Sequence, residues 1–160
     1  MIQTKKLRKH YRDWSYKPDK NIPIYGVSRR TITEDQLNEF FDYCLHWCHK
    51  KFGKVKGKSV PQIEWYWNEP RYQKHNMLGE YDKEENIIYL RIQGHRNIYN
   101  LANTLIHEWV HYMQPTHGNW YERYDRTHGY KENPYEVEAY HIGETYAVEC
   151  AKEVLGWMKG

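Results

Sequence analysis

The amino-acid sequence predicts an α+β fold in which a small sheet with a hairpin packs among helices. Apolar residues recur every three or four positions in residues 34–51 and 98–113, the spacing of helices with one buried face. Between these stretches, residues 60–67 alternate in polarity and residues 77–92 place two apolar segments around a polar turn, a pattern typical of strands. Residues 133–157 begin with Asn-Pro, which favours the start of a C-terminal helix.

Positive charge is concentrated at the N-terminal end of the chain. Residues 1–30 hold nine Lys or Arg and two Asp, a net charge of +7, whereas the whole chain carries +3. Because Pro18 and Pro23 argue against a long helix here, we expect residues 1–30 to form a basic extended arm and residues 31–160 to form a single domain. Such an arm can make weak contacts with nucleic acid, although a solvated arm without a partner explains the same composition.

Composition limits the compartments in which we expect the protein. The sequence has no apolar run long enough to cross a membrane, and its basic N-terminal region lacks the apolar segment of a secretory signal. The three Cys show no dense spacing, which favours a reducing compartment over a disulfide scaffold. A cytoplasmic protein without a membrane partner is therefore expected.

Thr33 is expected to cap the first helix through its side-chain oxygen. The apolar face of this helix consists of Leu37, Phe40, Phe41, Cys44, Leu45 and Cys48. Cys44 and Cys48, with His46 and His49 nearby, also have the composition of a second candidate metal cluster. Both Cys lie on the apolar face, so buried thiols are the preferred interpretation.

The strand pattern predicts both a core face and an edge. One face of the first strand is formed by Ile63, Trp65 and Trp67. The core side of the hairpin is formed by Ile88, Leu90 and Ile92. We expect residues 87–91 to be an exposed sheet edge, to which an extended peptide can add as a further strand.

Residues 98–113 contain the pattern H-E-x-x-H, formed by His107, Glu108 and His111. Residues four apart on a helix lie one turn above each other, so both imidazoles point the same way and can hold one metal ion. Glu108 lies beside them, where a carboxylate can take a proton from a water molecule that the metal activates. The pattern also arises by chance in chains rich in His and Glu, but here it lies centrally in an amphipathic helix that Asn97 can cap. The motif therefore predicts a metal site.

A catalytic zinc site usually has three protein ligands, so a third ligand is expected after this motif. The candidates are Glu136, Glu138, His117, His128 and His141. The helical face of Glu136 carries small residues, namely Ala139, Gly143, Ala147 and Cys150. Small residues let the last helix approach the motif helix closely, whereas the face of Glu138 is mostly polar, so Glu136 is preferred.

Residues 114–133 are expected to form a polar loop rich in aromatic residues and His. His117 lies ten residues after His107, as the last ligand does in the pattern H-E-x-x-H-x-x-G-x-x-H. The glycine that lets the chain turn in that pattern is replaced by Gln114, which argues against His117 as the third ligand.

With this motif helix, small sheet and last helix, residues 34–157 resemble a small zincin-type metallopeptidase. The stretch Glu136-Val137-Glu138-Ala139 is similar to the E-x-x-A element of gluzincin families, in which the first glutamate is the third zinc ligand. The resemblance implies a zincin-like α+β fold, zinc on His107, His111 and Glu136, and a peptidase that acts on a peptide or protein substrate. It also implies that Glu108 is the general base.

The resemblance leaves two parts of the site open. Tyr140 stands where several gluzincins carry an Asp that supports a zinc-bound His, so the residues around the ligands are unassigned. A donor for the developing oxyanion is also needed. The candidates for that role are Tyr124, His128, Tyr130 and Tyr140.

Three alternative interpretations remain at the level of sequence. The pairs His117-Gly118 and His128-Gly129 resemble SprT-like proteases, whose third ligand is a His. A zinc-stabilised module that binds nucleic acid or protein without turnover is the second, and a structural protein with an accidental motif is the third. Glu108 argues against the last two, because a purely structural site needs no base between its His ligands.

Overall fold

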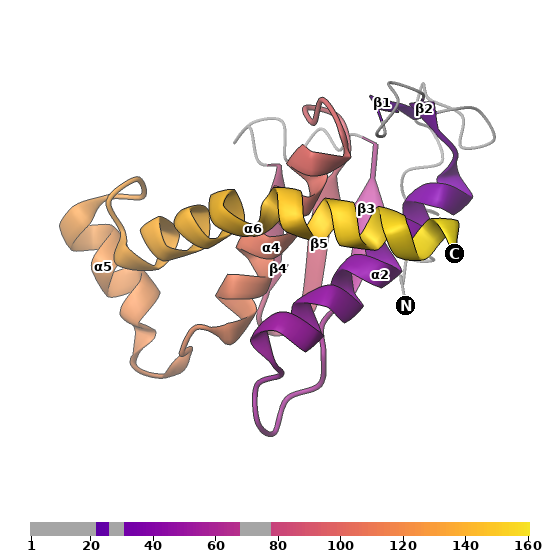
Figure 1. The fold of residues 1–160 in the computed structure, drawn as a ribbon. Coiled ribbons are helices and arrows are strands. Elements are labelled where there is room, and N and C mark those ends of the chain that lie inside the picture. Colours follow the sequence, from indigo (N-terminus) through magenta and orange to yellow (C-terminus); the bar gives the residue numbers. More distant parts are fainter. Residues whose placement is uncertain (1–21, 26–30, 68–77) are drawn as a thin grey trace.

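The computed structural model describes residues 22–25, 31–67 and 78–160, and these have the predicted α+β class (Figure 1). The strands are β1 (Ile22–Tyr25), β2 (Thr31–Ile32), β3 (Gln62–Tyr66), β4 (Gly79–Asp82) and β5 (Ile87–Arg91). The helices are α2 (Glu34–Phe52), α4 (Ile98–Met113), the 3-10 helix η1 (His117–Asn119), α5 (Trp120–His128) and α6 (Pro134–Lys159). The predicted helices and the predicted hairpin are all present.

α2 begins at the residue that the sequence predicts as its cap. Oγ1 of Thr33 accepts a hydrogen bond from the amide of Gln36 (3.1 Å), and Oε1 of Gln36 accepts one from the amide of Thr33 (2.9 Å). Two amide groups that the helix cannot satisfy are thereby bonded. The buried face of α2 consists of Leu37, Phe40, Phe41, Cys44, Leu45, Trp47 and Cys48.

The Cys and His residues of α2 do not form a metal site. Cys44 and Cys48 are fully buried free thiols, whereas His46 and His49 are exposed. Burial raises the pKa of both thiols, which keeps them protonated. The preferred interpretation of these Cys as core residues is confirmed.

β5 is the central strand of a three-stranded mixed sheet with the order β3-β5-β4. It runs parallel to β3, with Ile63 opposite Ile88, and antiparallel to β4, with Tyr81 opposite Ile88. The prediction that residues 87–91 form an exposed edge is wrong, because β3 and β4 occupy both sides of β5. The sequence shows the hairpin, but it gives no sign that β3 pairs with the far side of β5. In the described part of the chain, β4 is the edge strand that lies against α4.

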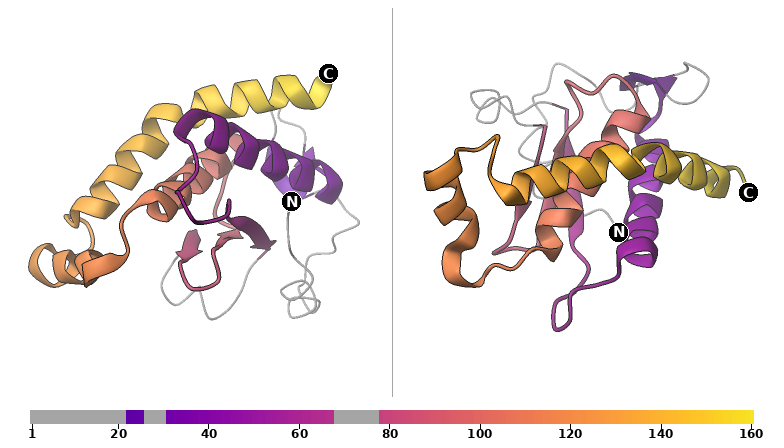
Figure 2. Two further views of the ribbon diagram at one scale, coloured as in Figure 1. Left: turned by 90° about the horizontal axis from the view of Figure 1, so that it is seen from below. Right: turned by 60° about the vertical axis from the view of Figure 1, so that its left-hand side comes forward.

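α2, α4 and α6 lie on one side of this sheet (Figure 2). The core between the helices and the sheet includes Ile63, Ile88, Leu90, Leu101, Leu105 and Trp109. α6 packs most extensively against α4. The buried residues of α6 include Glu136, Ala139, Gly143, Ala147 and Cys150, the small-residue face that the sequence predicts to approach the motif helix.

Gly143 marks the closest approach of α6 to α4. A Cβ atom at this position would lie 2.4 Å from Oδ1 and 3.0 Å from the carbonyl oxygen of Asn103. The side chain of Asn103 would have to turn away, and the two helices would have to separate by a few tenths of an ångström at this point. The absence of a side chain at Gly143 therefore permits the close approach of the helix with the motif and the helix with Glu136.

Gly143→Ala is expected to destabilise the protein, and Gly156→Ala in the same helix is its matched control. Overpacking costs about 1–3 kcal/mol, against a gain in helix propensity of about 1 kcal/mol. A Cβ at Gly156 meets nothing within 4 Å, so that variant should gain stability. Urea unfolding of both variants measures the difference, and equal shifts would contradict the close contact at Gly143.

The prediction that residues 114–133 form a loop is wrong, because they contain η1 and the nine-residue helix α5. None of the residues of α5 is buried, and its few aromatic side chains give too short a pattern in nine residues to be recognised as a helix from sequence. Ring contacts hold it instead. Trp120 stacks on Tyr124, and the ring of Tyr124 meets that of Tyr135 at the start of α6.

Most of the predicted basic arm lies outside the described residues. Within residues 1–30, the structure describes β1, which pairs antiparallel with β2. No helix of the described ranges is long and apolar enough to cross a membrane.

Candidate metal centre

α4 carries the H-E-x-x-H motif and begins at Asn97, whose side chain accepts a hydrogen bond from the amide of Asn100 (3.0 Å). Its apolar face is buried against the sheet and α6. This packing fixes the rotation of the helix, so that His107 and His111 project together from its partly exposed side. Glu108 lies on the neighbouring side and is only 6% exposed.

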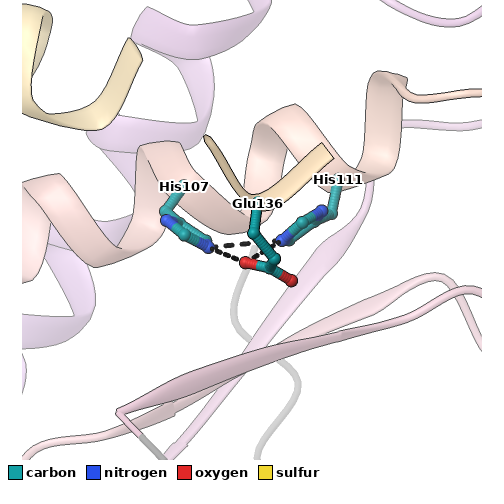
Figure 3. Close-up of side chains that lie close together, drawn as sticks. All are labelled: His107, His111 and Glu136. Atoms are coloured by element: carbon teal, nitrogen blue, oxygen red, sulfur yellow. Dashed lines mark hydrogen bonds and ion pairs between the residues drawn. The ribbon is translucent and has the colours of Figure 1, made fainter. Parts of the chain in front are cut away.

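The side chain of Glu136 reaches both imidazoles from the first turns of α6 (Figure 3). Its Oε1 lies 2.9 Å from Nε2 of His107 and 3.2 Å from Nε2 of His111, and the two Nε2 atoms are 3.2 Å apart. Within the described part of the chain this is the one group of three or more His, Cys, Asp or Glu side chains that can hold a metal ion. The structure thus brings together the three residues that the sequence predicts as ligands.

Gln114, the residue after α4, determines which nitrogen of His111 carries a proton. Its Nε2 donates to the carbonyl oxygen of Tyr135 and to Oε1 of Glu138, both at 2.9 Å. Its Oε1 therefore faces Nδ1 of His111 at 2.7 Å and must accept a hydrogen there. In the neutral imidazole the lone pair of Nε2 then points toward His107 and Glu136.

These contacts require a positive charge between the three side chains. A neutral Nε2 lone pair of His111 and the carboxylate of Glu136 are both acceptors, so they cannot bond to each other without a proton or a cation. Burial lowers the pKa of His111, but its hydrogen bond to Glu136 and the charges of Glu108 and Glu136 outweigh burial and raise this pKa to about 9. The donor set therefore fits a metal ion, and a proton replaces it in the metal-free protein.

The ligand carboxylate is held on its other oxygen. Tyr121 of α5 donates from its hydroxyl group to Oε2 of Glu136 (2.5 Å). Asn133 is completely buried, donates from Nδ2 to the backbone oxygen of Tyr121 (3.1 Å), and caps α6 by accepting from the amide of Tyr135 (3.0 Å). Burial raises the pKa of Glu136, but hydrogen bonds with His107 and His111 outweigh burial and hold this pKa well below its usual range.

Two cavities meet at Glu108. One of about 500 Å³ is lined by residues 79–84, the three candidate ligands and Tyr135. The other, of about 830 Å³, extends toward His95 and Asn103. The residues that line both cavities are Gly79, His107, Glu108 and Tyr130. Burial raises the pKa of Glu108, and the charges of His111 and His107 partly offset this effect.

The remaining ligand candidates lie outside the group. Glu138 is exposed and accepts from Gln114, so it supports a neighbour of the ligands. His117, His128 and His141 are exposed, and none belongs to the group of His107, His111 and Glu136.

Sequence reasoning missed the residues that hold the ligands. In the sequence, Gln114 indicates only the replacement of a glycine, Tyr121 is part of a predicted loop, and Asn133 marks only the start of the last helix. Polar side chains that are buried near a site usually support its ligands. Here their burial depends on α5 and on the turn before α6, which the sequence does not predict.

Comparisons of the chain with protein-family models, with curated proteins and with solved structures find no match.

Proposed function

We propose that the protein is a zinc-dependent peptidase with His107, His111 and Glu136 as the zinc ligands and Glu108 as the general base. One observation carries the proposal. The buried carboxylate of Glu108, which is not one of the candidate ligands, lies beside the group of three ligands. It also lines both of the cavities that meet there. A purely structural metal site would need neither this carboxylate nor open space next to the ligands.

The donor set favours zinc over harder cations. Two imidazole nitrogens and one carboxylate oxygen are a ligand set of catalytic zinc, whereas magnesium and calcium prefer oxygen donors. Three protein ligands would leave one coordination position of zinc for water or substrate. Zinc in this position would polarise the carbonyl group to be cleaved and make water a nucleophile near neutral pH.

The residues around the ligands have distinct roles in this proposal. Glu108 would take a proton from the attacking water and deliver it to the leaving amine. Of the four candidate oxyanion donors, Tyr130 is the one that lines both cavities. Burial and the charges of Glu136 and Glu108 raise the pKa of Tyr130 to about 12, so its hydroxyl group keeps the proton that it would donate to the oxyanion.

The path of the substrate is proposed to follow β4. β4 borders the cavity of about 500 Å³, and Gly79 at its start also lines the second cavity. In the described part of the chain β4 is an outer strand of the sheet. An extended peptide can pair with such a strand through main-chain hydrogen bonds that do not depend on the sequence of the peptide. Because the two cavities join at Glu108, both sides of the cleaved bond have room, which favours cleavage within a chain over removal of a terminal residue.

The content of zinc in purified variants tests this assignment. We expect one zinc ion per chain in the wild type and in Glu138→Ala, and loss of zinc in Glu136→Ala after dialysis against a weak chelator. Glu136 and Glu138 are two positions apart on the same helix, so the two variants distinguish a metal ligand from a residue that bonds only to Gln114. Loss of zinc in Glu138→Ala alone would transfer the third ligand to Glu138. A wild type without zinc would refute the proposal.

A further inference from the structure

The side chain of Gln114 is buried and uses its amide in three hydrogen bonds. It accepts from Nδ1 of His111 (2.7 Å) and donates to the backbone oxygen of Tyr135 and to the carboxylate of Glu138 (both 2.9 Å). The alternative orientation of the amide would place its oxygen against two acceptors. The two partners on α6 therefore fix the orientation of the amide, and the amide fixes the tautomer of His111.

We propose that Gln114, supported by Glu138, is a positioning residue that orients His111 for metal binding. The inference rests on the proposed function and deepens it. A ligand His is held by the partner of its second nitrogen, which sets both the ring angle and the lone pair offered to the metal. Tyr140 is 62% exposed, so it does not replace the Asp that the resemblance leads one to expect. Gln114, the residue after α4, occupies that role.

The neutral amide also limits the negative charge of the site. Two carboxylates already lie next to His111, because Oε1 of Glu136 is 3.2 Å from its Nε2 and Glu108 is buried beside it. A carboxylate bonded directly to Nδ1 would add a third one. With Gln114 between them, Glu138 polarises the imidazole through the amide while its own charge stays at the exposed surface of α6.

Gln114 also connects the two helices that supply the ligands. Its contacts run from His111, in the last turn of α4, to Tyr135 and Glu138, in the first turns of α6. The bonds thus join the segment with His111 to the segment with Glu136. Without the amide, the ring of His111 could rotate, and its distance from the carboxylate of Glu136 would no longer be fixed.

The test compares zinc affinity in Gln114→Met, Glu138→Ala and the double variant, measured by competition with a chromophoric chelator. Methionine keeps the length of the side chain but loses all three hydrogen bonds. We expect Gln114→Met to bind zinc about 10–100-fold more weakly, the usual effect of removing such a partner. Glu138→Ala should show a smaller loss, and adding it to Gln114→Met should cost nothing further, because Glu138 acts through the amide.

The control is Gln93→Met, the same substitution at an exposed glutamine, which should leave the affinity unchanged. The absorption spectrum of the cobalt-substituted protein gives a second readout, because it reports ligand geometry and is insensitive to stability alone.

Wild-type affinity and spectrum in a folded Gln114→Met variant would overturn the inference but leave the proposed function intact. Additive losses in the double variant would overturn the role of Glu138. If Gln114→Met does not fold, weaker affinity in Glu138→Ala supports the inference and unchanged affinity overturns it. A wild type that binds neither metal refutes the proposed function itself.

Discussion

Glu108→Gln is expected to abolish peptide hydrolysis while the protein keeps its metal. Glu108 is not one of the three ligands, and the amide has the size of the carboxylate but cannot accept the proton of the attacking water. General base catalysis contributes about 10²–10⁴ in rate, and we expect kcat/KM to fall by that factor. Hydrolysis of a labelled, denatured protein and the zinc content of the same sample measure the two effects.

The stability of this variant separates a chemical effect from an unfolding effect. Burial raises the pKa of Glu108, so the fold disfavours the ionised form of this side chain. Ionisation of Glu108 therefore lowers the free energy of unfolding. A neutral glutamine removes this cost, and the Tm of Glu108→Gln should equal or exceed that of the wild type. Glu39→Gln, an exposed substitution on α2 that lines neither cavity, should leave both activity and Tm unchanged. Full hydrolysis by zinc-loaded Glu108→Gln would exclude Glu108 as the base.

Much of this fold was predictable because short sequence patterns indicate its main helices. Capping residues and apolar periodicity mark the starts and buried faces of α2 and α4, and Asn133-Pro134 marks α6. The pairing of β3 with β5 was not predictable, because parallel partners are far apart in sequence and have no turn to signal them. α5 was missed for a different reason, since it buries no side chain.

The sequence indicates Glu136 rather than Glu138 as the candidate third ligand because the two residues lie on different faces of α6. Small residues on one face of α6 predicted a close approach to α4, and Glu136 lies on that face while Glu138 does not. The roles of Tyr121 and Gln114 are not visible in this pattern. Their partners become neighbours only when α5 and α6 fold back on α4, and a single sequence has no periodicity that records such contacts.

The metal-free protein is expected to lose stability as the pH rises from about 6.5 to about 9. The pKa of His111 is raised in the folded protein from 6.5 to about 9, so folding favours its protonated form. This contribution is complete below pH 6.5, where the unfolded chain is also protonated, and it disappears as the pH passes the folded-state pKa. Since one pKa unit corresponds to about 1.4 kcal/mol, the loss is on the order of 3 kcal/mol.

Unfolding by urea in the presence of a chelator, at several pH values in this range, measures the loss. Glu136→Gln should remove most of it, because the hydrogen bond and charge of Glu136 are leading causes of the raised pKa of His111. The comparison also corrects for Cys44 and Cys48, whose pKa values burial raises and which destabilise the fold at alkaline pH in both proteins.

The zinc-loaded protein should lose this pH dependence over the same range. Zinc and the proton compete for Nε2 of His111, so metal binding strengthens as the imidazole loses its proton. At saturating zinc neither the folded nor the unfolded chain carries a proton on His111 above about pH 6.5, so the free energy of unfolding should be nearly constant from there to about pH 9. Parallel pH profiles with and without zinc would show that the metal does not bind at His111. A falling profile without zinc and a flat profile with zinc would show that one group of side chains binds either the proton or the metal.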